Sequence, residues 1–281
     1  MAEKGKQTME IAYFPGCTLK NTAKRLETSA LGVAKLLGLD LRELPNWTCC
    51  GTCFSLAEDN LMKQVAPIRT LSRAASLGYS VITTLCSVCY NTLKQADLFV
   101  KSDPKRLKKI NTFMEEEANY EGQIAVKHFL TLLDELGEEK IKEAVKHNLN
   151  GLKVGCYYGC LLLRPQSIAI DDCEQPQIME RLMKALGAEP VYFPYQVECC
   201  GSYHTAVHPE IVARRAYRIL ENARENGAEI VVTSCPLCYF NLKDRQKNIK
   251  EIYSGFKPMK VSYFTEIMAD AFGLTKILEN G

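Results

Sequence analysis

Ten of the 13 cysteines in this 281-residue chain fall into two sets with the same order and nearly the same spacing. The first set reads C-x31-CC-x35-CxxC and the second reads C-x38-CC-x34-CxxC. The flanks repeat as well, because LGYSVITTLCSVCYNTLK (77–94) answers NGAEIVVTSCPLCYFNLK (226–243). Repetition over this length indicates a duplicated unit, so the fold must place five cysteines together twice.

Metal or iron–sulfur ligation explains these cysteines better than disulfides do. The cysteine count is odd, the chain is long enough to bury a core without disulfides, and the first residues, MAEKGKQTME, lack the apolar stretch of an export signal. A tetrahedral zinc site takes four ligands, and so does an ordinary cubane cluster. Five thiols per set therefore suggest a cluster of unusual shape. The candidate ligands are Cys17, Cys49, Cys50, Cys86, Cys89, Cys160, Cys199, Cys200, Cys235 and Cys238.

The adjacent cysteines in each set have a chemical interpretation of their own. At a turn between a strand and a helix, two neighbouring thiolates can splay toward two separate irons. The glycine that follows each pair, Gly51 or Gly201, lets the backbone turn tightly or approach an inorganic core. Backbone N–H groups at an adjoining helix start would favour the anionic sulfurs.

The hydrophobic pattern predicts an α/β fold with two pseudo-symmetric repeats, each a mostly parallel sheet flanked by helices. Residues 9–14, 81–84, 152–158 and 230–233 read as buried strands, short strands lead to each CC pair, and helices follow the strands. Every cysteine group follows a strand, so all should meet at the carboxyl ends. The predicted divisions are a disordered N-terminus (1–8), a first repeat with a charged linker (9–150) and a second repeat (151–281).

Composition excludes several other functions. The chain is 47% hydrophobic and 24% charged, as in soluble globular proteins, and its net charge of +2 gives no argument for nucleic acid or an anionic membrane surface. It has no uncharged apolar run of the roughly 18 residues that a membrane helix needs. We therefore expect a cytoplasmic protein without membrane insertion. No G-x-G-x-x-G follows a strand, so flavin binding by this chain is not expected.

The two complete cysteine patterns resemble the CCG-domain family, and residues 9–275 are similar to the B subunits of heterodisulfide reductases. This resemblance implies that each set of five cysteines holds one noncubane 4Fe-4S cluster. It also implies that the clusters face each other across a disulfide substrate, which in methanogens is the mixed disulfide of coenzymes M and B. The implied partners are a ferredoxin-like iron–sulfur subunit of the C type and a flavin subunit of the A type. No side-chain nucleophile is required.

Two other functions stay open. Relatives with CCG repeats also serve as electron-transfer subunits of flavin-linked 2-hydroxy-acid dehydrogenases and lactate-utilisation complexes. A structural zinc scaffold is a non-enzyme alternative, although five cysteines per set fit it poorly.

Four further side chains lie near the motifs without joining the pattern. Cys53, Cys156 and Cys173 have no equivalents in the other repeat, and we interpret them as packing residues or hydrogen-bond donors, with Cys156 the strongest exception. His204 is a candidate proton donor or sulfide contact, or else a cap of the next helix.

Overall fold

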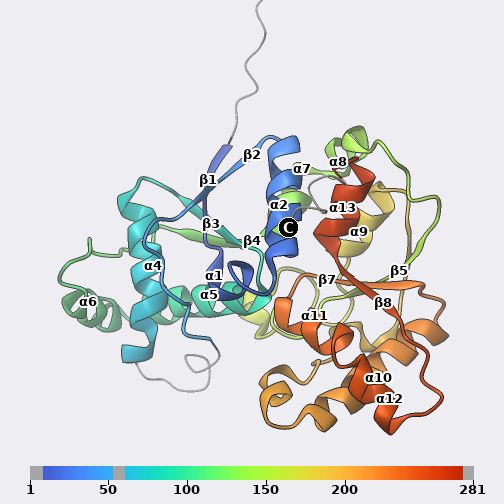
Figure 1. Ribbon diagram of the computed structural model, residues 1–281. Helices are drawn as coiled ribbons and strands as arrows, with labels where there is room; N and C mark the ends of the chain where they lie inside the picture. Colours follow the sequence, from blue (N-terminus) through green and yellow to red (C-terminus); the bar gives the residue numbers. More distant parts are fainter. Residues whose placement is uncertain (1–8, 53–60, 275–281) are drawn as a thin grey trace, which may run out of the picture.

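The computed structural model describes residues 9–52 and 61–274, and the first half of the chain builds one layer of strands with helices around it (Figure 1). The expected disorder of residues 1–8 and the role of Cys53 lie outside the described residues. In order, the first half contains β1 (Met9–Tyr13), α1 (Gly16–Leu19), α2 (Lys24–Leu36), β2 (Leu39–Glu43), the 3-10 helix η1 (Leu61–Gln64), α4 (Val65–Ser76), β3 (Val81–Thr84), α5 (Ser87–Lys101), α6 (Pro104–Phe113), β4 (Ala125–His128), α7 (Phe129–Leu136) and α8 (Glu138–Ala144).

The second half repeats this order with small changes. It contains β5 (Lys153–Tyr157), η2 (Gln166–Ile168), α9 (Ile178–Ala185), β6 (Glu189–Val191), η3 (Pro194–Val197), η4 (Ser202–Ala206), α10 (Pro209–Glu225), β7 (Ile230–Thr233), α11 (Pro236–Lys243), α12 (Gln246–Ile252), β8 (Lys260–Tyr263) and α13 (Phe264–Ala271).

Each half holds one four-stranded parallel sheet, with the orders β2-β1-β3-β4 and β6-β5-β7-β8. The predicted α/β fold with two pseudo-symmetric repeats is confirmed. The β-branched runs VITT and IVVT form β3 and β7 next to the central strands β1 and β5, where β-branched side chains pack well. The fourth strand of each sheet, β4 or β8, was absent from the expected strands.

The charged segment between the repeats contains exposed helices. α6 begins at an Asp103 cap, whose carboxylate accepts the N–H of Lys105 at 2.8 Å, and it buries only Ile110. α8 buries only Ile141. None of the described helices is long and apolar enough to cross a membrane.

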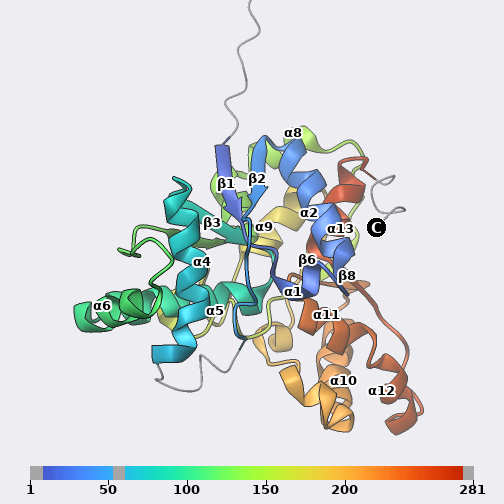
Figure 2. The same cartoon turned by 60° about the vertical axis from the view of Figure 1, so that its left-hand side comes forward.

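The two halves pack against each other through α2, α7, α9 and α13. Figures 1 and 2 show α2 and α13 side by side, and the Ser29 and Thr265 hydroxyls lie 2.6 Å apart between these helices. The buried rings of Phe129 and Phe264 meet with their centroids 6.4 Å apart. These contacts join the two sheets into one body and fix the position of one cysteine set relative to the other.

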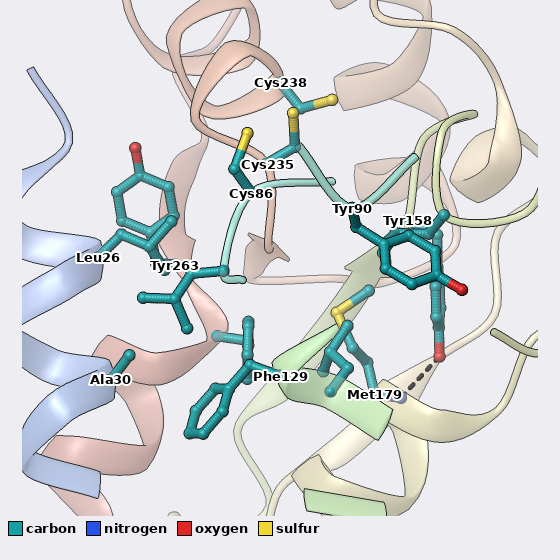
Figure 3. Close-up of a cluster of buried hydrophobic side chains, with 14 of the residues drawn as sticks. Leu26, Ala30, Cys86, Tyr90, Phe129, Tyr158, Met179, Cys235, Cys238 and Tyr263 are labelled. Atoms are coloured by element: carbon teal, nitrogen blue, oxygen red, sulfur yellow. Dashed lines mark hydrogen bonds between the residues drawn. The ribbon is translucent and has the colours of Figure 1, made fainter. Parts of the chain in front are cut away.

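The buried carboxyl of Glu180 in the second half makes the stability of the fold depend on pH. The Tyr158 O–H donates to Oε2 of Glu180 at 2.5 Å, and the Met179 N–H donates to the Tyr158 hydroxyl at 2.6 Å (Figure 3). Burial raises the pKa of Glu180 to about 7. Because this folded-state pKa lies above the unfolded value, the carboxyl stabilises the fold at low pH, and that contribution is lost as pH rises through about 7.

We expect the Glu180→Gln variant to be more stable than the parent at pH 8, by about 3 kcal/mol, and to show no such gain at pH 4.5. The glutamine carbonyl can still accept the Tyr158 hydrogen bond, but it cannot ionise. Thermal unfolding of the anaerobic protein at the two pH values measures the difference. Exposed Glu189→Gln serves as the control, and parallel pH curves for parent and Glu180→Gln would contradict the expectation.

Candidate metal centre

Three neighbouring strands of each sheet deliver the ten cysteines to one edge. In the first half Cys17 follows β1, the CC pair follows β2, and the CxxC motif follows β3. The second half repeats this with β5, β6 and β7. The predicted location at the strand carboxyl ends is therefore confirmed. The order in which the chain adds strands reverses between β1 and β3, and between β5 and β7. Ligands of such sheets bind at this topological switch point.

The five thiols of the first half touch one another in sequence. The Sγ atoms of Cys17 and Cys49 lie 4.0 Å apart, and those of Cys50 and Cys89 lie 3.6 Å apart. Cys49 and Cys50 shift each other's pKa, and so do Cys89 and Cys86. One end of this set is exposed at Cys17 and Cys49, and the other end is buried.

The thiols of the second half lie in the equivalent order. Neighbouring thiols shift each other's pKa along the order Cys160, Cys199, Cys200, Cys238, Cys235, which places them next to one another. Cys160 and Cys199 are half-buried, while the other three are buried.

The buried ends of the two sets meet at the boundary between the repeats. The Cys86 and Cys235 thiols shift each other's pKa, and Figure 3 shows both sulfurs beside that of Cys238. The Ser87 and Ser234 hydroxyls form a buried hydrogen bond of 3.0 Å between the same two segments. The ten sulfurs thus form one continuous row, in the order Cys17, Cys49, Cys50, Cys89, Cys86, Cys235, Cys238, Cys200, Cys199, Cys160.

Backbone geometry at this edge favours anionic sulfur. Cys86 and Cys235 are the N-cap residues of α5 and α11, at the positive ends of the helix dipoles. Hydrogen bonds from Cys49 and Cys89 lower the pKa of Cys50 to about 3. In the second set, hydrogen bonds from Cys160 and Cys200 lower the pKa of Cys199 to about 2. Each set can therefore carry negative charge on sulfur, the form that binds metal.

A glycine before the first cysteine of each set makes room for a sulfur. A Cβ atom on Gly16 would lie 2.8 Å from the Cys89 Sγ, and one on Gly159 would lie 3.2 Å from the Cys238 Sγ. Both glycines also have positive φ, of +71° and +66°. This role was not predicted, although the repeated glycine next to Cys17 and Cys160 was the available signal.

The fourth strands bring two residues that the sequence analysis did not place at this edge. His128 ends β4, and its Nε2 lies 3.1 Å from the carbonyl of Leu85, the residue before Cys86. Its Nδ1 accepts the Leu130 N–H, so Nε2 carries the proton and donates; burial lowers the pKa of His128 to about 4 and keeps the ring neutral. Tyr263 ends β8, where Cys235 and Cys86 help burial to raise its pKa.

The remaining candidates lie apart from the sulfur row. Cys156 is buried within β5, a central strand of its sheet, and the Cys173 thiol donates to the Leu163 carbonyl at 2.9 Å. Both match the interpretation as packing or donor residues. His204 is exposed in η4, and the N-cap of α10 is His208, so the expectation that His204 caps this helix is wrong. The His208 N–H donates to the His204 carbonyl at 2.6 Å in the turn before α10.

The donor set fits iron–sulfur clusters better than single metal ions. Among the described residues, no group of three or more His, Cys, Asp or Glu side chains is arranged to hold one metal ion. The row instead offers sulfur alone, which is the donor type that iron–sulfur clusters use. Five sulfurs per set are one more than a tetrahedral ion takes.

Comparisons with known proteins agree with this chemistry. Residues 11–94 and 154–243 each match the model of the CCG family, described as a cysteine-rich domain. The chain is 33% identical over 268 residues to the membrane anchor subunit of the 8-methylmenaquinol:fumarate reductase of Wolinella succinogenes, covering 94% of this chain and 93% of that protein. It is 27% identical to a protein of Archaeoglobus profundus that is named as similar to the B subunits of heterodisulfide reductases, covering 97% of this chain and 99% of that protein.

A solved structure with the same fold is a protein of undefined function. A hypothetical protein from Helicobacter pylori superposes with a TM-score of 0.75 at 12% identity, and the match covers 96% of this chain but 50% of that one. The matching cysteine motifs, the two family-model matches and the near full-length relatives lead to one conclusion. This chain belongs to the cysteine-rich CCG family and carries two copies of its domain.

Proposed function

We propose that this chain is an iron–sulfur subunit of an oxidoreductase complex and that its ten cysteines hold two noncubane 4Fe-4S clusters. The unbroken row of ten sulfurs, five from each repeat, carries the proposal. The ligands of the first cluster are Cys17, Cys49, Cys50, Cys86 and Cys89. Those of the second are Cys160, Cys199, Cys200, Cys235 and Cys238.

The chain supplies the surroundings that such centres need. The N-termini of α5 and α11 and the N–H groups after each CC pair face the sulfurs and offset negative charge. Buried Tyr90, whose hydroxyl donates to the Ile168 carbonyl at 2.6 Å, helps to keep water from the meeting point of the two sets. When bound, two one-electron centres supply the two electrons that cleavage of one S–S bond consumes.

We propose disulfide reduction as the reaction, with a mixed disulfide of the coenzyme B and coenzyme M type, or a related one, as substrate. Relatives named as B subunits of heterodisulfide reductases, or as similar to them, support it at 24–27% identity over nearly the whole chain. A ferredoxin-like iron–sulfur subunit and a flavin subunit would then pass electrons to this chain. The sulfur row would let both sets exchange electrons over a short distance, because Cys86 and Cys235 lie close enough to shift each other's pKa.

A second reaction is favoured by one observation. The relative with the higher identity, 33%, is a subunit of a quinol:fumarate reductase. In that case the two centres would relay electrons between a quinol and a partner subunit instead of reducing a disulfide. An assay of the purified complex separates the two. Disulfide-dependent oxidation of a reduced viologen dye supports the first reaction, and dye oxidation only with a quinone supports the second.

Anaerobic isolation should give about eight irons and eight sulfides per chain, from two 4Fe-4S centres. Oxidation in the presence of a thiol should produce a paramagnetic signal that the identity of the thiol alters. Iron and sulfide analysis together with EPR measures both. Zinc in place of iron would overturn the proposal, and four irons with a signal indifferent to thiols would reduce it to a single relay centre.

A further inference from the structure

Each sulfur set has its own backbone hydrogen-bond donors, at equivalent positions of the two repeats. The N–H groups of the two residues after each CC pair donate to the sulfurs of that pair. These are Gly51 and Thr52 in the first repeat, and Gly201 and Ser202 in the second. Since these contributions are matched, a difference between the two centres has to come from side chains.

Equivalent side chains three residues after each CxxC motif differ in what they can donate. In the second repeat this residue is Asn241, which is fully buried on α11. Its Nδ2 lies 3.3 Å from the Cys200 Sγ and 3.1 Å from the Ser202 carbonyl oxygen. An amide nitrogen has two hydrogens, so one is committed to the carbonyl and the other to the sulfur.

In the first repeat the equivalent residue is Thr92, also fully buried. Its hydroxyl contacts the Cys50 thiol, but it also lies 2.9 Å from the Val88 carbonyl oxygen, one helical turn earlier. A hydroxyl has a single hydrogen, so the bond to sulfur competes with the bond to the carbonyl. The first set therefore receives a weaker side-chain hydrogen bond than the second.

A charged side chain also distinguishes the two sets, and it too favours negative charge at the second. Arg215 donates to the Cys199 carbonyl at 3.2 Å, so its positive charge lies next to the second set. The positions 149 and 150 residues earlier hold the uncharged Ala66 and Val65.

Near the first set, two carboxylates surround one lysine. Lys20 lies 2.6 Å from Glu27 and 2.6 Å from Glu43, so one positive charge faces two negative ones. Both carboxylates and Cys89 add to burial in raising the pKa of Tyr13, which places them in one neighbourhood. The charges around Lys20 therefore sum to one negative charge near the first set, whereas Arg215 brings a positive charge to the second.

From these differences we infer that, within the proposed function, the second-repeat centre has the higher reduction potential and is reduced first, with Asn241 as the main positioning residue. Reduction adds negative charge, and hydrogen bonds to cluster sulfurs and nearby positive charge stabilise the reduced form. An electron that enters at the first-repeat centre would then pass to the second-repeat centre, which is reduced while the first-repeat centre returns to its oxidised form.

The test exchanges the two side chains. We expect Asn241→Thr to lower the potential of the second centre and Thr92→Asn to raise that of the first. Each change should alter the equilibrium between the two singly reduced forms by about tenfold, which corresponds to 59 mV for one electron. Anaerobic redox titration followed by EPR measures both potentials. Variants that lack either Cys50 and Cys89 or Cys200 and Cys238 assign each signal to its centre.

Gln246→Leu is the matched control, because it removes a buried amide of the same repeat that bonds to the Leu242 and Met259 carbonyls and not to sulfur. It should leave both potentials unchanged. Arg215→Gln, a surface change that keeps the buried packing, should lower the second potential if Asn241→Thr does not fold. A loaded protein whose first-repeat centre is reduced first, or whose potentials ignore the exchange, would overturn this inference alone. Absence of iron would overturn the proposed function with it.

Discussion

Replacing Cys200 and Cys238 together by alanine is expected to halve the iron content, from about eight to about four per chain. A double change is needed because loss of one thiol would leave four, and four thiolates can still hold an ordinary cluster. These two thiols are neighbours within the second set, and neither takes part in the contact between Cys86 and Cys235. The double change removes one thiol of the CC pair and one of the CxxC motif, so we expect the second centre to be lost.

The first set offers the mirrored variant. Cys50 and Cys89, with sulfurs 3.6 Å apart, correspond to Cys200 and Cys238, and their joint replacement should remove the other half of the iron. Cys156→Ala is the control: this thiol is equally buried, but it lies inside β5 and away from the row. Iron analysis and the EPR signals of each purified variant decide the matter. A full iron content in both double variants would contradict the ligand assignment.

The duplicated spacing was enough to predict the repeats, the parallel sheets and the edge where the cysteines gather. Strands β3 and β7 carry continuous β-branched runs, and both lead directly into a CxxC motif, so local pattern and tertiary position agree. The helix after the second CC pair, α10, could also be predicted, because proline is common in the first turn of a helix and Pro209 stands there.

Strands β4 and β8 were missed because each has only four residues and follows a charged or polar stretch. They pair only with the outer side of β3 and β7, so their stability comes from tertiary contacts and not from local pattern. A repeat does mark them, since AVKHF and KVSYF share a valine and a phenylalanine at the same spacing. Comparison of the two halves beyond the cysteine motifs would have found it.

The contact between Cys86 and Cys235 could not be read from spacing. It depends on how the two sheets dock through α2 and α13, and spacing within one repeat carries no information about that docking. The same limit applies to Ser87 and Ser234, which touch across the boundary although they are not equivalent positions of the repeat. The sequence thus predicted the content of each set but not the row that the two sets form together.

Gly159→Ala is expected to remove the second centre as completely as the loss of two ligands, although it deletes no sulfur. The new Cβ would lie 3.2 Å from the Cys238 Sγ at a φ of +66°, so this sulfur has to shift by a few tenths of an ångström from its place beside the other ligands. Gly16→Ala, with its Cβ 2.8 Å from the Cys89 Sγ, should do the same to the first centre. Iron content should fall to about four per chain in either variant, with one EPR signal missing.

Gly38→Ala separates sulfur displacement from backbone strain. Gly38 has a φ of +79°, but a Cβ there would meet nothing within 4 Å. It should therefore lower the free energy of unfolding by about 1–2 kcal/mol, the cost of a left-handed residue, and keep all the iron. If Gly159→Ala also keeps all its iron while losing a similar amount of stability, the close approach of Cys238 to the YYGC turn is not required for the centre. If instead only the Gly16→Ala and Gly159→Ala variants lose iron, the backbone before the first cysteine of each set shapes the site as directly as the ligands do.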